Sequence, residues 1–190
     1  AAARDLGLPI PDKSAASYVI GLGLQDAMQA AIPDVDPKYY PRIVERYRHH
    51  YLGQDKDLTL FEGVPEMLAD LSQQGYFLAV ATGKSRVGLN RAMNSTGLLS
   101  KFDATRCADE TFSKPHPAML QELTRELGQD MHRTVMIGDT THDLQMAINA
   151  GAKGVAVEFG AHPPQQLQTL APLYSARSIR ELHQWLNEHA

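Results

Sequence analysis

The chain has 190 residues, of which 43% are hydrophobic and 21% are charged. These fractions are close to those of globular domains, so they exclude a disordered chain, a collagen-like repeat and a coiled coil. The length suffices for one domain with its own hydrophobic core, or for one domain with a small addition. Eighteen Lys and Arg residues against 22 Asp and Glu give a formal net charge of −4, which argues against a nucleic-acid-binding surface.

The sequence also argues against a secreted or membrane-bound protein. The single cysteine, Cys107, cannot form an intramolecular disulfide, which fits a reducing cytosol. The apolar runs are too short to span a bilayer, and we find no charged-then-apolar leader. We therefore expect a cytoplasmic protein with no membrane or nucleic-acid partner. The sequence predicts no particular oligomeric state.

The first 57 residues carry only helical signals. Residues 1–7 read as the last turn of a helix that ends at Gly7, and Leu24–Ile32 is a short amphipathic segment. Asp36 and Pro37 form a capped helix start, followed by apolar residues at helical spacing up to Gly53: Ile43, Val44, Tyr47 and Tyr51. We predict an all-helical unit over residues 1–57.

From Leu58 onward, helical and strand patterns alternate up to the end of the chain. The strand patterns are continuous apolar runs, typical of strands that are covered on both faces. In chain order we predict a helix opening at Pro65, a strand at Tyr76–Ala81, a helix at Ser85–Thr96, a strand within Phe102–Ala108, a helix opening at Pro117, a strand at Thr134–Ile137, a helix ending at Gly151, a strand at Gly154–Val157 and a final helix with Ile179, Leu182 and Leu186 inward.

This alternation predicts that residues 58–190 form an α/β domain with a doubly wound parallel sheet. Ligands bind such sheets at the carboxyl ends of the strands, so polar residues at those ends are candidate site residues. Thr82 and Gly83 follow the first predicted strand and precede a helix N-terminus, which suits an anionic oxygen. The alternative is that Thr82 and Ser85 only cap the helix.

Two further strand ends carry charged residues. Lys114 lies in a segment stiffened by Pro115 and Pro117, so it can neutralise a phosphate, or it can be an exposed turn residue. Asp139 ends the strand at Thr134–Ile137, and Asp143 follows four residues later. At that spacing both carboxylates can face one point and hold Mg²⁺, although an Asp turn with a helix cap has the same pattern.

Together these motifs resemble the haloacid dehalogenase-like (HAD) hydrolase superfamily, and within it the phosphoglycolate phosphatase-type members with a small helical cap. Thr82 matches the second family motif, Lys114 the third, and Gly138, Asp139 and Asp143 the fourth. The resemblance implies a Rossmann-like sheet over residues 58–190 with residues 1–57 as the cap. It also implies a Mg²⁺-dependent phosphatase that acts on a small phosphorylated metabolite through an aspartyl-phosphate.

The resemblance implies a role for each matching residue. Thr82 and the N–H of Gly83 would hold phosphoryl oxygens, and Lys114 would offset the negative charge of nucleophile and phosphate. Asp139 would bind the metal directly, with Asp143 supporting it.

The first family motif, Asp-x-Asp-Gly-Thr on the first and central strand, is absent from these residues. Asp34 and Asp36 have the spacing but follow no apolar strand run. We favour a fragment whose nucleophile lies upstream over a stand-alone remnant, and we expect the chain alone to be inactive. A non-catalytic module that binds phosphate and metal, and a sugar-phosphate mutase of the same superfamily, stay open as alternatives.

Two minor features complete the sequence-based predictions. The eight histidines lack zinc-type spacing, and we expect them to be solvated. Gly21 and Gly23 lie between two predicted cap helices and can form a turn that reaches the active site. Nothing in residues 1–57 identifies the substrate.

Overall fold

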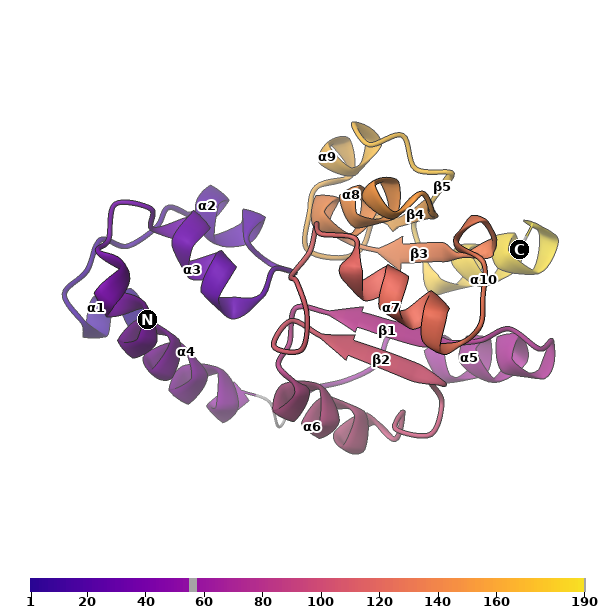
Figure 1. Cartoon of the computed structure of the whole chain (residues 1–190), viewed down its shortest axis with the longest axis horizontal. Coiled ribbons are helices and arrows are strands. Elements are labelled where there is room, and N and C mark those ends of the chain that lie inside the picture. Colours follow the sequence, from indigo (N-terminus) through magenta and orange to yellow (C-terminus); the bar gives the residue numbers. More distant parts are fainter. Residues whose placement is uncertain (55–57, 190) are drawn as a thin grey trace.

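The computed structural model describes residues 1–54 and 58–189 (Figure 1). Up to residue 54 every described element is a helix, as predicted: α1 (Ala2–Asp5), α2 (Lys13–Tyr18), α3 (Leu24–Ala31), a 3₁₀ turn (Pro37–Tyr39) and α4 (Tyr40–Gln54). Figure 1 shows these helices grouped to one side of the strands. They share a small apolar cluster of their own, made of Ala2, Ile32, Val35, Tyr40 and Ile43.

Helix boundaries follow the capping residues closely. Asp36 accepts a hydrogen bond from the Lys38 N–H at the start of the 3₁₀ turn. Gly7 follows α1 with a φ of 65°, a left-handed conformation that favours glycine. The predicted end at Gly53 is wrong, because α4 continues to Gln54. An isolated glycine costs a helix only about 1 kcal/mol, so it does not always end one.

The remaining described residues alternate between helices and strands. Their elements are α5 (Val64–Gln73), β1 (Ala79–Thr82), α6 (Arg86–Thr96), β2 (Ala104–Cys107), α7 (Ala118–Glu126), a 3₁₀ turn (Met131–Arg133), β3 (Val135–Gly138), α8 (Thr141–Ala150), β4 (Lys153–Val157), α9 (Pro164–Gln168), β5 (Tyr174–Ala176) and α10 (Ile179–His189). The α/β class and the parallel pairing are therefore confirmed. The sequence analysis missed β5 and α9, which are too short to show a period.

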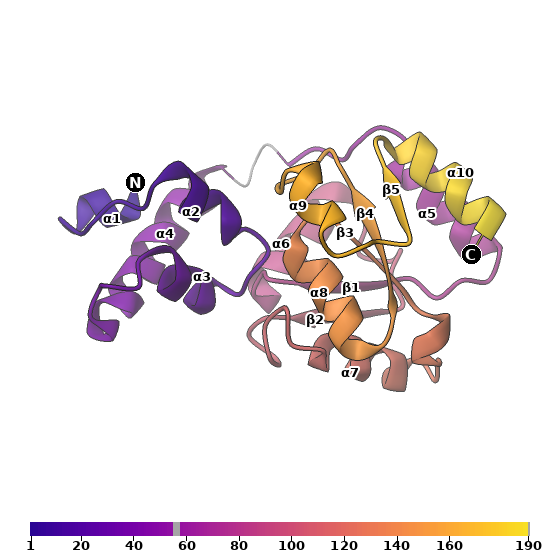
Figure 2. The ribbon, with the colours of Figure 1, turned by 90° about the horizontal axis from the view of Figure 1, so that it is seen from above.

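The strands form two parallel sheets where the sequence predicts one. β1 pairs with β2, and β3, β4 and β5 pair in that order; among the described residues no hydrogen-bonded ladder joins β1 to β3. Figure 2 shows α5 and α10 on one side of the strands and α7 and α8 on the other. Ala81 of β1 and Met136 of β3 belong to one apolar cluster under α7 and α8. The two sheets are therefore parts of one layer between shared helices.

The strand at β1 is less covered than its apolar sequence predicts. It begins at Ala79, three residues later than expected, and Ala79 is exposed. Phe77, within the predicted strand, is 54% exposed. The expectation of a strand covered on both faces is therefore wrong here. The physical reason is that β1 has a strand neighbour on one side only among the described residues.

Candidate active site

A buried ion pair joins two of the predicted site residues. The Lys114 Nζ donates to Asp143 Oδ1 at 2.6 Å, and the two side chains are 7% and 4% exposed. Lys114 comes from the segment between β2 and α7, whereas Asp143 lies in the first turn of α8. The alternative of an exposed turn lysine is therefore wrong. A charge of each sign is desolvated here, which proteins tolerate when the two charges are paired.

Asp143 also caps its own helix. Its Oδ2 accepts hydrogen bonds from the Thr140 backbone N–H at 3.1 Å and from the Thr140 hydroxyl at 2.7 Å. The Asp143 N–H in turn donates to Thr140 Oγ1, which completes a capping box. The capping interpretation of this residue is correct, and it coexists with the contact to Lys114. Together these contacts fix the orientation of the Asp143 carboxylate.

Asp139 is held by a different part of the chain. Its Oδ2 accepts a hydrogen bond from the Ala161 N–H at 2.8 Å, and its backbone oxygen accepts one from the His162 N–H at 3.1 Å. A side chain on Gly160 would overlap the Asp139 carboxylate, so only glycine fits there. The turn after β4 therefore braces Asp139, whereas Lys114 and Thr140 engage Asp143. The described hydrogen bonds of the two carboxylates share no partner.

Thr82 and Gly83 end β1 beside a turn of the helical region. The Thr82 hydroxyl accepts a hydrogen bond from the Lys84 N–H at 3.1 Å, in the turn before α6, whereas Ser85 caps that helix by accepting one from the Gly88 N–H. A Cβ on Gly83 would overlap the carbonyl oxygens of Gly21 and Leu22. The close backbone approach expected at Gly83 is therefore present, and the partner is the chain itself.

The turn from Gly21 to Gly23 reaches the strand ends, as its position between helices predicts. A Cβ on Gly21, whose φ is 97°, would lie 3.1 Å from the Thr140 side chain. The Gly23 N–H donates to the Ser113 hydroxyl at 2.7 Å. The turn thus contacts the loops after β1, β2 and β3 at once, through Gly83, Ser113 and Thr140.

Sequence reasoning missed the residues that follow β4. Gly160, Ala161 and His162 lie at the carboxyl end of a predicted strand, so the strand-end rule could have found them. The expectation that the histidines are solvated is wrong for two of them: His142 is 5% exposed and His162 is 2% exposed. Burial lowers the pKa of His142.

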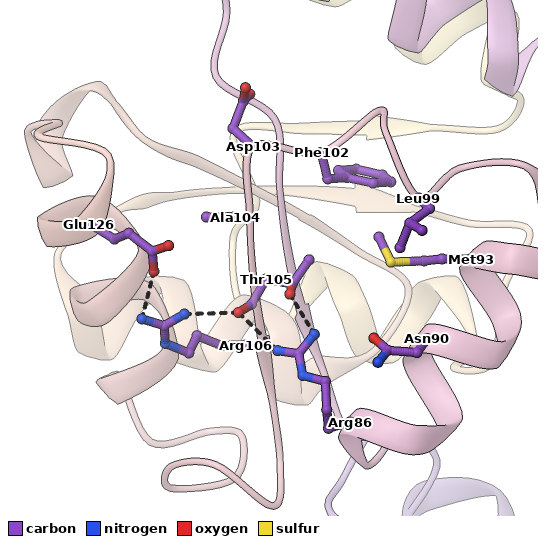
Figure 3. A pocket seen from close by; sticks show the side chains of 10 residues that line it. All are labelled: Arg86, Asn90, Met93, Leu99, Phe102, Asp103, Ala104, Thr105, Arg106 and Glu126. Atoms are coloured by element: carbon purple, nitrogen blue, oxygen red, sulfur yellow. Dashed lines mark hydrogen bonds and ion pairs between the residues drawn. The ribbon is translucent and has the colours of Figure 1, made fainter.

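Cavities in the described part of the molecule differ in whether they reach the predicted site residues. A cavity of about 600 Å³ lies between α3 and the Lys114 segment, with Asp26, Gln29 and His116 in its lining. A second, of about 350 Å³, lies along the outer edge of β2 and contains none of the predicted site residues (Figure 3). The first cavity has Lys114 in its lining and so adjoins the predicted site, but Thr82, Gly83, Asp139 and Asp143 do not line it.

The second cavity is closed to anions by its own ion pairs. Arg86 and Arg106 both donate to the carbonyl oxygen of Thr105, as the dashed lines in Figure 3 show. Arg86 also binds Glu110, and Arg106 binds Glu122 and Glu126. Their charge is therefore already neutralised, and they occupy a carbonyl that an added strand would use.

The carboxylates at the strand ends supply some, but not all, of the ligands that a divalent cation such as Mg²⁺ needs. Asp139 and Asp143 supply carboxylate oxygens, which Mg²⁺ prefers. Within residues 1–54 and 58–189, no group of three or more His, Cys, Asp or Glu side chains is placed to hold a metal ion. The two carboxylates would therefore supply part of a coordination shell, with water, phosphate oxygens or further residues supplying the rest.

Comparison with known proteins decides the family. The family profile described as haloacid dehalogenase-like hydrolase matches residues 1–157. The chain belongs to this family. The probable phosphatase IndB of Dickeya dadantii (strain 3937) is 40% identical to this HAD chain over 177 residues, which cover 90% of the chain and 76% of that protein. A phosphoglycolate phosphatase of Agrobacterium fabrum is 33% identical over 128 residues, covering 67% and 53%.

Solved structures share the fold of this HAD chain. A hydrolase from Pseudomonas syringae superposes with a TM-score of 0.90 at 18% identity, covering all of the chain (100%) and 88% of that structure. A β-phosphoglucomutase from Clostridium difficile superposes with a TM-score of 0.81 at 17% identity, covering 99% and 87%. The prediction of a HAD hydrolase of the phosphatase type is confirmed by the family and the curated relatives. No described helix is both long and apolar enough to cross a membrane.

Proposed function

We propose that this chain is the cap and most of the core of a Mg²⁺-dependent phosphomonoester hydrolase that acts on a small phosphorylated metabolite in the cytoplasm. Residues 1–57 would be the cap and residues 58–190 the core, although residues 55–57 and 190 lie outside the described residues. The observation that carries this proposal is the buried pair of Lys114 and Asp143 at the carboxyl ends of parallel strands. The phosphatase names of the curated relatives support it.

Each site residue has a role in this reaction. The Thr82 hydroxyl and the Gly83 N–H would donate to phosphoryl oxygens, and the Lys114 ammonium would offset the negative charge that the phosphate brings. Asp139 and Asp143 would hold Mg²⁺, which neutralises charge on the transferring phosphoryl group when bound. Asp143 is already oriented for this by Thr140 and Lys114.

The nucleophile in this proposal lies outside the 190 residues. A carboxylate oxygen attacks phosphorus, the P–O bond to the leaving alcohol breaks, and a second carboxyl group gives the alcohol its proton. The second carboxylate then takes a proton from a water molecule that attacks phosphorus, the P–O bond to the aspartate breaks, and phosphate and the free nucleophile result. Among the described residues, β1 and β3 each have one edge without a strand partner. This supports the placement, because a parallel strand between them would end beside Thr82 and Asp139.

Turnover of p-nitrophenyl phosphate tests the proposal. We expect the gene to encode an apolar strand ending in Asp-x-Asp-Gly upstream of Ala1, and the protein that includes it to release p-nitrophenol with Mg²⁺ and to stop with EDTA. We expect the 190-residue chain to release none. Turnover by the short chain would overturn the location of the nucleophile. Phosphate-dependent thermal stabilisation of the longer protein without turnover would overturn catalysis and favour a binding module.

A further inference from the structure

Two buried histidines that the proposed reaction does not use meet the helical region at a single atom. The Nε2 atoms of His142 and His162 lie 2.7 Å and 3.0 Å from the backbone oxygen of Tyr18. Tyr18 is the last residue of α2, His142 lies in the first turn of α8, and His162 lies in the loop after β4. A carbonyl oxygen has two lone pairs and can accept both hydrogen bonds.

The hydrogen-bond network fixes which nitrogen of His162 carries the proton. The Thr141 backbone N–H donates to His162 Nδ1 at 3.1 Å, so this nitrogen acts as an acceptor. The proton of the neutral ring is then on Nε2, which donates to the Tyr18 oxygen. The contact is therefore a directed hydrogen bond from the core to the helical region.

Ring packing supports the same contact. The Tyr18 ring meets the His142 ring edge-on at 5.0 Å and stacks on the His162 ring at 5.7 Å, and the two imidazoles are 5.3 Å apart. Aromatic pairs in this distance range attract each other. Tyr18 itself is 51% exposed, so the histidines hold it from one side at the surface of the core.

The hydrogen bonds to Tyr18 lie just before the Gly21–Gly23 turn, which contacts the predicted site. Ser113 holds the other end through the Gly23 N–H. Between them, Gly21 lies against Thr140, and the Gly21 and Leu22 carbonyls lie against Gly83. Both views show the connection between α2 and α3 reaching the core (Figures 1 and 2).

We propose that His142 and His162 are positioning residues that latch the Tyr18 carbonyl and so hold the Gly21–Gly23 turn against Gly83 and Thr140. A substrate that binds beside Gly83 then contacts a turn that the core already holds in place. The latch therefore affects the affinity for substrate. This proposal rests on the proposed function for its kinetic consequence, whereas the latch itself can be measured without catalysis.

Amide hydrogen exchange of the full-length protein tests the latch directly. His142→Leu and His162→Leu each remove one donor to Tyr18, and His162→Gln keeps a donor near the Nε2 position. We expect exchange in residues 19–23 to accelerate about fivefold in each Leu variant, the effect of one lost hydrogen bond, and to return toward wild type in His162→Gln. His183→Leu is the matched control. It also removes a histidine hydrogen bond, but this bond joins His183 of α10 to Asp70 of α5 and does not involve Tyr18.

Kinetic measurements with a phosphate monoester distinguish a positioning role of His142 and His162 from a purely structural one. We expect the Leu variants to raise KM about fivefold and to keep kcat within about twofold, since the groups that hold the phosphoryl oxygens stay in place. His183→Leu should change neither constant. Wild-type exchange in both Leu variants, or an equal change in His183→Leu, would overturn the latch. Absence of turnover in the wild type would overturn the proposed function but not the latch, because amide hydrogen exchange measures the latch without catalysis.

Discussion

At the scale of single residues, the sequence predicts candidate site residues but not the contacts that hold them. Lys114 could be predicted as a phosphate-binding residue only because Pro115 and Pro117 restrict its segment and exclude a helix there. The spacing of Asp139 and Asp143 predicts that both carboxylates face one point, and the structure adds that Asp143 is bonded to Lys114 and Thr140. Four-residue spacing places two side chains in the same region, but burial and hydrogen-bond donors decide where each carboxylate points.

The Lys114–Asp143 pair leads to a stability prediction. We expect Lys114→Met in the 190-residue chain to lower the free energy of unfolding by about 3 kcal/mol, because it leaves a buried carboxylate unpaired. Urea denaturation measures this loss. Adding Asp143→Asn should recover part of it by removing the orphaned charge. Lys38→Met is the control, since Lys38 and Asp36 form an exposed pair with side chains 66% and 52% accessible. Equal losses in both single variants would contradict the argument.

At the scale of elements, helices were predictable because local side chains end them. Ser85 accepts a hydrogen bond from Gly88 N–H at the start of α6, and Gly151 ends α8 with a φ of 79°. Strands were less predictable, because their limits depend on neighbours distant in sequence. β5 has only three residues, and β1, which starts later than predicted, has one neighbouring strand within the described part of the chain.

The start of α6 is fastened to the loop after β2 by a carboxylate with a strongly lowered pKa. Glu110 accepts hydrogen bonds from the Arg86 guanidinium and the Cys107 N–H, and these lower its pKa from 4.5 to about 2. Its stabilising effect is therefore complete above pH 4.5 and is lost as the pH falls toward 2. We expect the wild type to have a higher urea midpoint than Glu110→Gln above pH 5, and the difference to shrink between pH 4.5 and 2. A difference independent of pH would show that the charge of Glu110 is not involved.

At the scale of the whole molecule, the α/β class follows from the alternation of periods, whereas the division into two sheets does not. The pattern of apolar runs predicts strands but contains no information about which strand pairs with which. The site shows the same limit: the order of Thr82, Lys114 and Asp139 at successive strand ends was predicted. The bracing of Asp139 by Ala161 and the turn at Gly21 depend on how distant loops meet.

The separation of the two sheets makes the final prediction possible. β1 and β3 each lack a partner on one side among the described residues, and Phe77, just before β1, and Ala79, its first residue, are exposed. If a strand from the preceding part of the protein lies between β1 and β3, it satisfies backbone groups on both edges and removes apolar surface from water. We therefore expect the protein with that segment to unfold at a temperature several degrees above that of the 190-residue chain and to bind less 8-anilinonaphthalene-1-sulfonate.

A variant of the added strand serves as the control. Replacing two alternate apolar residues of this strand by Lys should abolish both effects, because α7 or α5 cannot cover an inward-facing charge. Equal melting temperatures with and without the segment would show that the two edges do not accept a strand.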